Sequence, residues 1–168
     1  MPSAKILQQK QEMVNSVAEK LKAAVSIVAV DYKGISVAND TALRAEMREN
    51  NVDYFVAKNS ILKYACEKSG HDAFIPVLAG STAIAVSDDD ALAPLKVVQK
   101  YADRLRDIYN TKKGYVDGRY IEPADIKIFA TLPPRETLIA MVAGSFNSII
   151  ASFARAISEV AKQKEETV

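Results

Sequence analysis

A pair of prolines near residue 133 places the strongest constraint on how this chain of 168 residues can fold. Leu132-Pro133-Pro134 follows a segment with helical spacing. Proline lacks an amide proton, and its ring clashes with the preceding helical turn, so a helix that reaches this point must end. The pattern predicts a hinge over Thr131 to Pro134, with one part over residues 1–131 and another over residues 132–168.

The segment after the hinge is predicted to be one long amphipathic helix, from Arg135 to about Lys164, with Gly144 as a kink site. Burying one phenylalanine or isoleucine side chain contributes about 1.5–3 kcal/mol of stabilising free energy. The apolar stripe of this helix is therefore expected to be buried against another surface. That surface is either the chain's own first part or the helices of a partner, and the hinge favours the partner. Small residues beside the stripe would let partner helices approach closely: Ala151, Ser152, Ala154 and Ala156. The stripe consists of Phe146, Ile149, Ile150, Phe153, Ile157 and Val160.

The part before the hinge alternates predicted strands with predicted helices. About half of the residues are apolar, which is enough for a buried core. The alternation predicts an α/β fold, a layered αβ sandwich followed by a projecting C-terminal helix. The predicted strands are Val25–Val30, Val52–Ala57, Thr82–Val86 and, around Gly114, Ile108–Thr111 and Tyr115–Tyr120; the predicted helices are Ser3–Lys22, Ser36–Asn50, Ile61–Lys68, Ser87–Arg104 and Glu122–Thr131.

Two basic loops follow the first two predicted strands: Asp31-Tyr32-Lys33-Gly34 and Lys58-Asn59-Ser60. Loops at the ends of neighbouring strands tend to meet in space. Lysine for phosphate, asparagine for a base edge or ribose, and tyrosine for a stacked base could together bind a nucleic acid. The alternative is turn chemistry, with glycine at positive φ, asparagine or serine as a helix cap and solvated lysines. Spacing alone favours turn chemistry.

The charges give no independent sign of a nucleic-acid partner, because 22 basic residues stand against 21 acidic ones. An RNA-binding chain of this composition must gather its basic groups on one face. The single cysteine excludes an internal disulfide and fits a reducing compartment. We see no apolar run of membrane-spanning length and no signal-peptide core, and expect a soluble cytoplasmic protein without a membrane partner.

Catalytic and metal-binding patterns receive little support. His71, the single histidine, follows Gly70 and is predicted to lie in an exposed turn, while Cys66 is predicted on the core side of a helix. One histidine and one cysteine make no metal cluster. Asp88-Asp89-Asp90 is explained by helix capping, and the glycines stand singly, without a phosphate-binding loop. We therefore expect no enzyme, no metal and no cofactor.

The order of the motifs resembles the family of bacterial large-subunit ribosomal stalk-base proteins, over nearly the whole chain. A lysine-bearing first helix and the apolar C-terminal helix frame the match. Ser60 stands where the family often has threonine, and Ala57 where many members have a bulkier residue. The motifs are Val28-Ala29-Val30-Asp31-Tyr32-Lys33-Gly34-Ile35-Ser36, Leu43-Arg44, Val56-Ala57-Lys58-Asn59-Ser60, Leu78-Ala79-Gly80-Ser81-Thr82-Ala83 and Leu132-Pro133-Pro134-Arg135-Glu136.

The resemblance implies a ribosome-bound scaffold. Its first domain would bind large-subunit rRNA at the stalk base, beside another ribosomal protein. Its last helix would carry acidic stalk protein dimers that recruit translation GTPases, and its length suits two dimers. In some bacteria the family also represses translation of its own messenger. The residues implied to contact RNA are Lys5, Lys10, Tyr32, Lys33, Gly34, Lys58, Asn59 and Ser60, and those implied to contact stalk protein are the six of the apolar stripe.

Two other functions remain open from the sequence. One is a binding module unrelated to the ribosome, whose terminal helix forms a homodimer. The other is a small enzyme that uses Lys58 or the Asp88 to Asp90 run.

Overall fold

The computed structural model describes residues 4–105, 108–133 and 135–166, with the side chains of residues 4, 5, 135, 149, 150, 160, 161 and 163–166 left out. The chain divides into two compact units, Met1–Thr131 and Leu132–Val168. The first unit contains a sheet with helices on both faces, and the second contains a helix. The predicted mixed α/β class is confirmed.

The first unit is built on one five-stranded antiparallel sheet with the strand order β2-β3-β1-β4-β5. β3 pairs antiparallel with both β1 and β2. β1 and β2 therefore run in the same direction, and their C-terminal ends lie at the same end of the strands of the sheet. The strands are β1 (Ser26–Asp31), β2 (Asp53–Val56), β3 (Ala83–Ser87), β4 (Asn110–Val116) and β5 (Arg119–Ile121).

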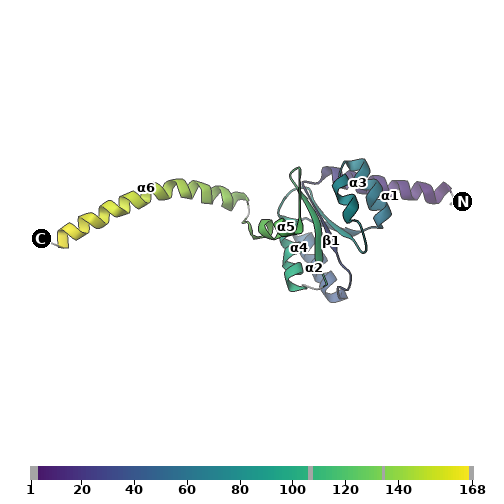
Figure 1. The fold of residues 1–168 in the computed structure, drawn as a ribbon, viewed down its shortest axis with the longest axis horizontal. Helices are drawn as coiled ribbons and strands as arrows, with labels where there is room; N and C mark the ends of the chain where they lie inside the picture. The colour runs from purple at the N-terminus through teal and green to yellow at the C-terminus, as the bar shows by residue number, and fades with distance from the viewer. Residues whose placement is uncertain (1–3, 106–107, 134, 167–168) are drawn as a thin grey trace. The chain divides into compact units, whose positions relative to one another are not determined.

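Helices cover both faces of the sheet because successive strand residues point to opposite sides. α1 and α3 lie on one side of the sheet and α2 and α4 on the other (Figure 1). Ile27 and Ala29 pack with α1 and α3, while Val28 and Val30 pack with α2 and α4. The result is a three-layer sandwich with one apolar core on each side of the sheet. The helices are α1 (Ala4–Ala23), α2 (Val37–Glu49), α3 (Asn59–Ser69), α4 (Ala93–Arg104) and α5 (Pro123–Thr131), with a short 3₁₀ helix, η1, at Asp72–Val77.

The predicted ends of α2 and α3 are partly confirmed. Ser36 caps α2, and its Oγ accepts from the Asn39 amide at 3.4 Å. Gly70 ends α3 in the left-handed region, with φ of 80°. The prediction that Asn59 or Ser60 caps α3 was wrong, because Lys58 occupies the cap position without a side-chain hydrogen bond.

The acidic run does not begin α4, contrary to prediction. The helix begins at Ala93, after a turn in which the Asp90 amide donates to Ser87 Oγ at 3.2 Å. The Leu92 amide in turn donates to Asp90 Oδ1 at 2.9 Å. Pro94 lies in the first turn of α4, where its missing amide proton costs no helical hydrogen bond.

Gly114 lies inside the single strand β4 and does not separate two strands as predicted. The turn of the hairpin is Asp117-Gly118, where φ is 45° and 87°. A Cβ on Gly114 would lie 2.7 Å from Ile121 Cγ1 and 3.2 Å from Ile126 Cδ1. The glycine is needed because β5 and α5 pack against this point of β4.

The second unit contains α6 (Arg135–Glu166), which continues through Gly144. By length and composition its segment Glu136–Glu159 could cross a membrane, since it contains a stretch of 18 residues with a mean hydropathy of 1.6. The expectation that no apolar run reaches membrane-spanning length was therefore wrong. Scattered serines and Asn147 interrupt the run, but its mean hydropathy remains high. This is weak evidence for a membrane, since other apolar helices pass the same test.

Gly114→Ala should destabilise the first unit by about 1–3 kcal/mol, because Ile121 and Ile126 are buried and have little room to move. Urea unfolding followed by circular dichroism measures this. Gly144→Ala is the matched control, because nothing lies within 4 Å of its Cβ position, and it should leave the unfolding midpoint of the first unit unchanged. Equal midpoints for the Gly114→Ala variant and the unmodified chain would contradict the packing argument.

Candidate nucleic-acid interface

Three loops meet where β1 and β2 end and β3 begins. They line one shallow groove, formed by Tyr32, by residues 56–60 and by residues 80–82. We call this region, with residues 31–34, the loop edge. Its first two loops are the predicted ones. The third loop, Gly80-Ser81-Thr82, was missed as a site, although it belongs to one of the family motifs.

The third loop holds the other two together. β3 lies between β1 and β2, so the predicted loops are not direct neighbours. The Asn59 side-chain amide donates to the Gly80 carbonyl at 2.8 Å, and Ser81 Oγ donates to Asp31 Oδ1. Asn59 therefore acts within the protein as a tie between loops. That contact occupies one of the two amide protons of Asn59, a side chain predicted to contact RNA.

Lys112 of β4 donates hydrogen bonds to the third loop of the loop edge and to the residue before it. This role was not predicted from the sequence. Lys112 Nζ donates to the carbonyls of Ala79 at 2.6 Å and Ser81 at 2.8 Å, and to Thr82 Oγ1 at 3.0 Å. Asp31 Oδ2 lies 3.9 Å away, and only 13% of the Lys112 side chain is exposed. Its donors are used inside the protein. No sequence signal separates this lysine from the adjacent Lys113.

The charge of Asp31 is balanced by these neighbours. Burial alone would raise the pKa of its carboxyl, but hydrogen bonds from Ser81 and the Lys33 amide outweigh this effect. The charges of Lys112 and Lys33 act in the same direction, so the pKa lies below its ordinary value of 3.8. Asp31 is therefore an ionised structural anchor at neutral pH.

The remaining predicted RNA residues differ in their exposure. Gly34 has φ of 89°, and the Lys33 amide donates to Asp31 Oδ1 at 3.1 Å, which is the turn chemistry of the alternative interpretation. That turn presents the exposed side chain of Lys33. Lys58, Ser60 and Lys10 are also exposed, Tyr32 is half-buried against the core, and the side chain of Lys5 lies outside the described residues.

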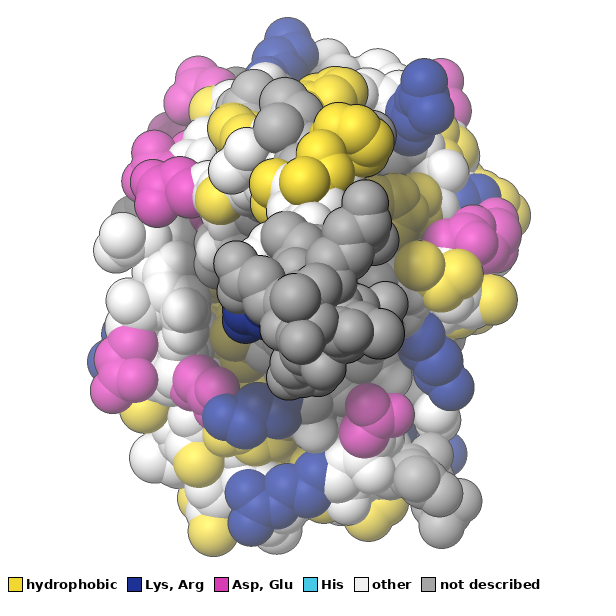
Figure 2. Space-filling view, turned by 90° about the vertical axis from the view of Figure 1, so that its left-hand side faces the viewer, with side chains coloured by type: hydrophobic (Ala, Val, Ile, Leu, Met, Phe, Trp, Pro, Cys, Tyr) yellow, Lys and Arg dark blue, Asp and Glu magenta, His cyan; other side chains and the backbone are white. Residues whose placement is uncertain are grey.

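Positive charge is not concentrated on the face shown in Figure 2, where Lys and Arg side chains are interspersed with Asp and Glu. The loop edge is defined by local geometry: the exposed Lys58 lines the groove, and the exposed Lys33 follows Tyr32, which also lines it.

His71 is buried, with 8% exposed, and does not lie in an exposed turn as predicted. Its Nδ1 lies 3.1 Å from Tyr120 Oη and its Nε2 lies 3.2 Å from the Leu21 carbonyl. Cys66 lies in the core as predicted, and burial, followed by the charges of Asp72 and Glu67, raises its pKa to about 11. Within the described residues, no group of His, Cys, Asp and Glu could hold a metal.

The predicted partner-binding stripe lies on α6. Phe146 and Phe153 are each 70% exposed, and Ile157 is 55% exposed. Residues 149, 150 and 160 belong to the same helix, but their side chains lie outside the described residues.

Asp31→Asn should lower the free energy of unfolding by about 1 kcal/mol at neutral pH, because the amide keeps the shape but loses the charge-assisted bonds. The lowered pKa makes the stabilisation by Asp31 present above pH 3.8 and lost as pH falls through the folded value. Denaturant titrations between pH 7 and pH 2 should therefore show a shallower acid loss in the variant.

Asp89→Asn is the control for this measurement, since Asp89 is exposed. It should reproduce the pH profile of the unmodified chain. A profile of Asp31→Asn that matches this control would refute the anchoring role of Asp31.

Comparison with protein families supplies the identity. The family model described as Ribosomal protein L10 matches residues 5–103, which include the three loops of the loop edge. The model described as Ribosomal protein uL10 C-terminal region matches residues 132–167, which include α6. One match falls in each unit, in the expected order, and the chain therefore belongs to the ribosomal protein L10 family of rRNA-binding, structural components of the large ribosomal subunit.

Proposed function

We propose that the chain is a two-part scaffold, in which α6 anchors dimers of an acidic stalk protein and the loop edge holds rRNA at the stalk base. The observation that carries the proposal is the uncovered apolar stripe of α6. The dimers would in turn recruit translation GTPases. A neighbouring large-subunit protein beside the loop edge and a cytoplasmic location belong to the same proposal.

The spacing of the exposed residues supports helical partners for α6. Phe146, Phe153 and Ile157 lie seven and four residues apart, so they share one face of the helix. Burying each contributes about 1.5–3 kcal/mol, which is a large driving force for a helix of this length. Partner helices can cover such a stripe along several turns.

Length supports two stalk dimers. The helix from Gly144 to Glu166 contains about six turns. Each dimer needs a separate stretch of the stripe, and this length suits two better than three.

The exposed lysines support the RNA half of the proposal. Lys33 and Lys58 have exposed side chains, whereas Lys112 is used by internal oxygens. Phosphate neutralisation depends strongly on salt, while apolar burial on α6 does not. The two binding functions thus use different chemistry on different units. The RNA-binding unit could also repress the chain's own messenger, where that messenger carries a similar RNA fold.

We further propose that the chain has no catalytic function. The raised pKa of Cys66 keeps it a neutral thiol, and both ring nitrogens of His71 have partners inside the protein. Asp90 stabilises the turn before α4 through Ser87 and Leu92. These contacts give structural roles to Cys66, His71 and Asp90.

Lys33→Ala and Lys58→Ala should each weaken binding to a large-subunit stalk-base rRNA fragment, because each removes one candidate phosphate contact. Each should also reduce the slope of log affinity against log salt by about 0.9 or less. Filter binding across a salt series measures both quantities. Lys127→Ala, an exposed lysine on α5, is the control and should leave the slope unchanged. Unchanged slopes in both loop variants would remove the loop edge as the RNA site.

Phe153→Asp should abolish binding of acidic stalk protein and leave RNA binding intact, because it places a charge in the centre of the stripe. Native mass spectrometry of the purified complex should show two bound dimers for the unmodified chain. Asn147→Asp introduces a carboxylate at a polar position of α6 and should retain the dimers.

A truncation after Thr131 should lose stalk binding completely. Three bound dimers would refute the length argument. A full-length chain that is folded and yet binds no stalk protein would refute the anchor role. A tight self-dimer in sedimentation that ignores stalk protein would favour the homodimerising module.

A further inference from the structure

β2 is the terminal strand of the sheet, and its outer edge is uncovered. It pairs with β3 on one side only. Beyond that ladder, no backbone hydrogen bond of Asp53–Val56 is found within the described residues. In an antiparallel pair, every second residue directs its N–H and C=O away from the partner, so β2 presents unpaired donors and acceptors.

Hollows accompany β2 on both of its faces. On the α1 side, a mostly apolar groove is lined by Met13, Phe55 and Ile61. On the α2 side, another hollow is lined by Arg44, Arg48, Val52, Asp53 and Tyr54. An added strand would thus find room for side chains on both faces.

The two faces differ in charge. On the α1 side, Lys20 is already paired with Asp53 at 2.6 Å and lies over the Phe55 ring, and Glu12 also lines the groove. This side offers mostly apolar surface, and its groove is lined by one acidic and one basic side chain, Glu12 and Lys58.

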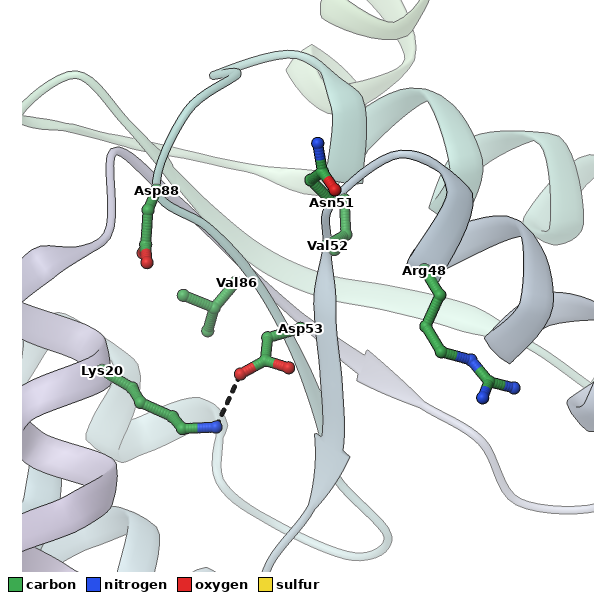
Figure 3. A pocket seen from close by; sticks show the side chains of 7 residues that line it. All are labelled: Lys20, Arg48, Asn51, Val52, Asp53, Val86 and Asp88. Atoms are coloured by element: carbon green, nitrogen blue, oxygen red, sulfur yellow. Dashed lines mark hydrogen bonds and ion pairs between the residues drawn. The ribbon is translucent and has the colours of Figure 1, made fainter.

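The α2 side offers a free cation. Arg44 is paired with Asp40 at 2.8 Å and stacks over Tyr54. Arg48 donates to the Arg44 carbonyl at 3.1 Å and has no carboxylate partner within the described residues. Figure 3 shows Arg48 on the opposite side of the strand from the Lys20–Asp53 pair.

We propose that the outer edge of β2 is a docking site for an extended segment of a protein partner with alternating apolar and acidic side chains. The segment adds to the sheet as a sixth strand. Its apolar side chains enter the groove beside Phe55, and its acidic side chains face Arg48, because strand side chains alternate with a period of two residues. RNA fits this edge less well, since it offers no backbone ladder and no apolar side chains for the groove.

The test uses the full-length chain and a fluorescein-labelled hexapeptide in which glutamate and valine alternate. Fluorescence anisotropy gives the affinity, and amide hydrogen exchange should show added protection in Asp53–Val56. A peptide with the same composition in two blocks should bind at least tenfold more weakly, because it cannot match both faces. A version with alternate residues N-methylated should also bind at least tenfold more weakly, because it cannot complete the ladder.

Arg48→Glu should weaken the alternating peptide by about tenfold, with Arg48→Gln intermediate. Arg104→Glu, an exposed arginine in the last turn of α4, is the matched control and should keep the affinity. Melting temperatures close to that of the unmodified chain would exclude unfolding as the cause.

Three results would overturn the proposal. One is equal binding of the alternating and block peptides, or no binding of either. Another is an N-methylated peptide that binds as well as the parent. The third concerns RNA. If Arg48→Glu weakens binding of the rRNA fragment more than Arg104→Glu does, and leaves the peptide affinity unchanged, the outer edge of β2 is assigned to RNA.

Discussion

The antiparallel pairing of β3 with both β1 and β2 is the constraint on which the loop edge depends. It makes β1 and β2 parallel without a direct ladder between them, and it places the start of β3 between their ends. The loop before β3 can therefore bond to both neighbours, through Ser81 to Asp31 and through Gly80 to Asn59. Lys112 donates hydrogen bonds to the carbonyl oxygens of Ala79 and Ser81 in the same region. The exposed Lys33 and Lys58 therefore belong to loops that are hydrogen-bonded to one another.

The same pairing leaves β2 at one end of the sheet. A sheet that is not closed has two end strands. Within the part of the chain that the structure describes, α1 and α2 cover the faces of β2, and no strand pairs with its outer edge. The loop edge and the free edge of β2 thus have one topological origin. They nevertheless suit different partners, because the first presents side-chain cations and the second presents backbone groups.

Much of the fold could be predicted because its signals are local. Leu43 and Met47 recur at helical spacing, Ser36 is a strong cap, and Gly70 allows a left-handed helix end. The errors arose where a contact between residues far apart in the sequence decides the local structure. Gly114 is inside β4 because Ile121 and Ile126 occupy its Cβ space, and His71 is buried because Tyr120 and Leu21 satisfy its ring. Two of the three loops of the candidate site were predicted from their basic residues, whereas the role of Lys112 depends on a β1–β4 register that no local pattern encodes.

The packing of α5 has a mechanical consequence for the chain. Any tension on α6 must pass through α5, because the chain is continuous from Thr131 to Arg135. Ile126 fixes α5 in the core, and Gly114 lets β5 and α5 sit directly on β4, a strand held between β1 and β5. A load on α6 is therefore carried first by the contacts of α5 with α4 and with β4, an interior strand of the sheet that is far from the end strand β2. The position of α5 lets the second unit be pulled without the force falling directly on the loops that face the candidate RNA.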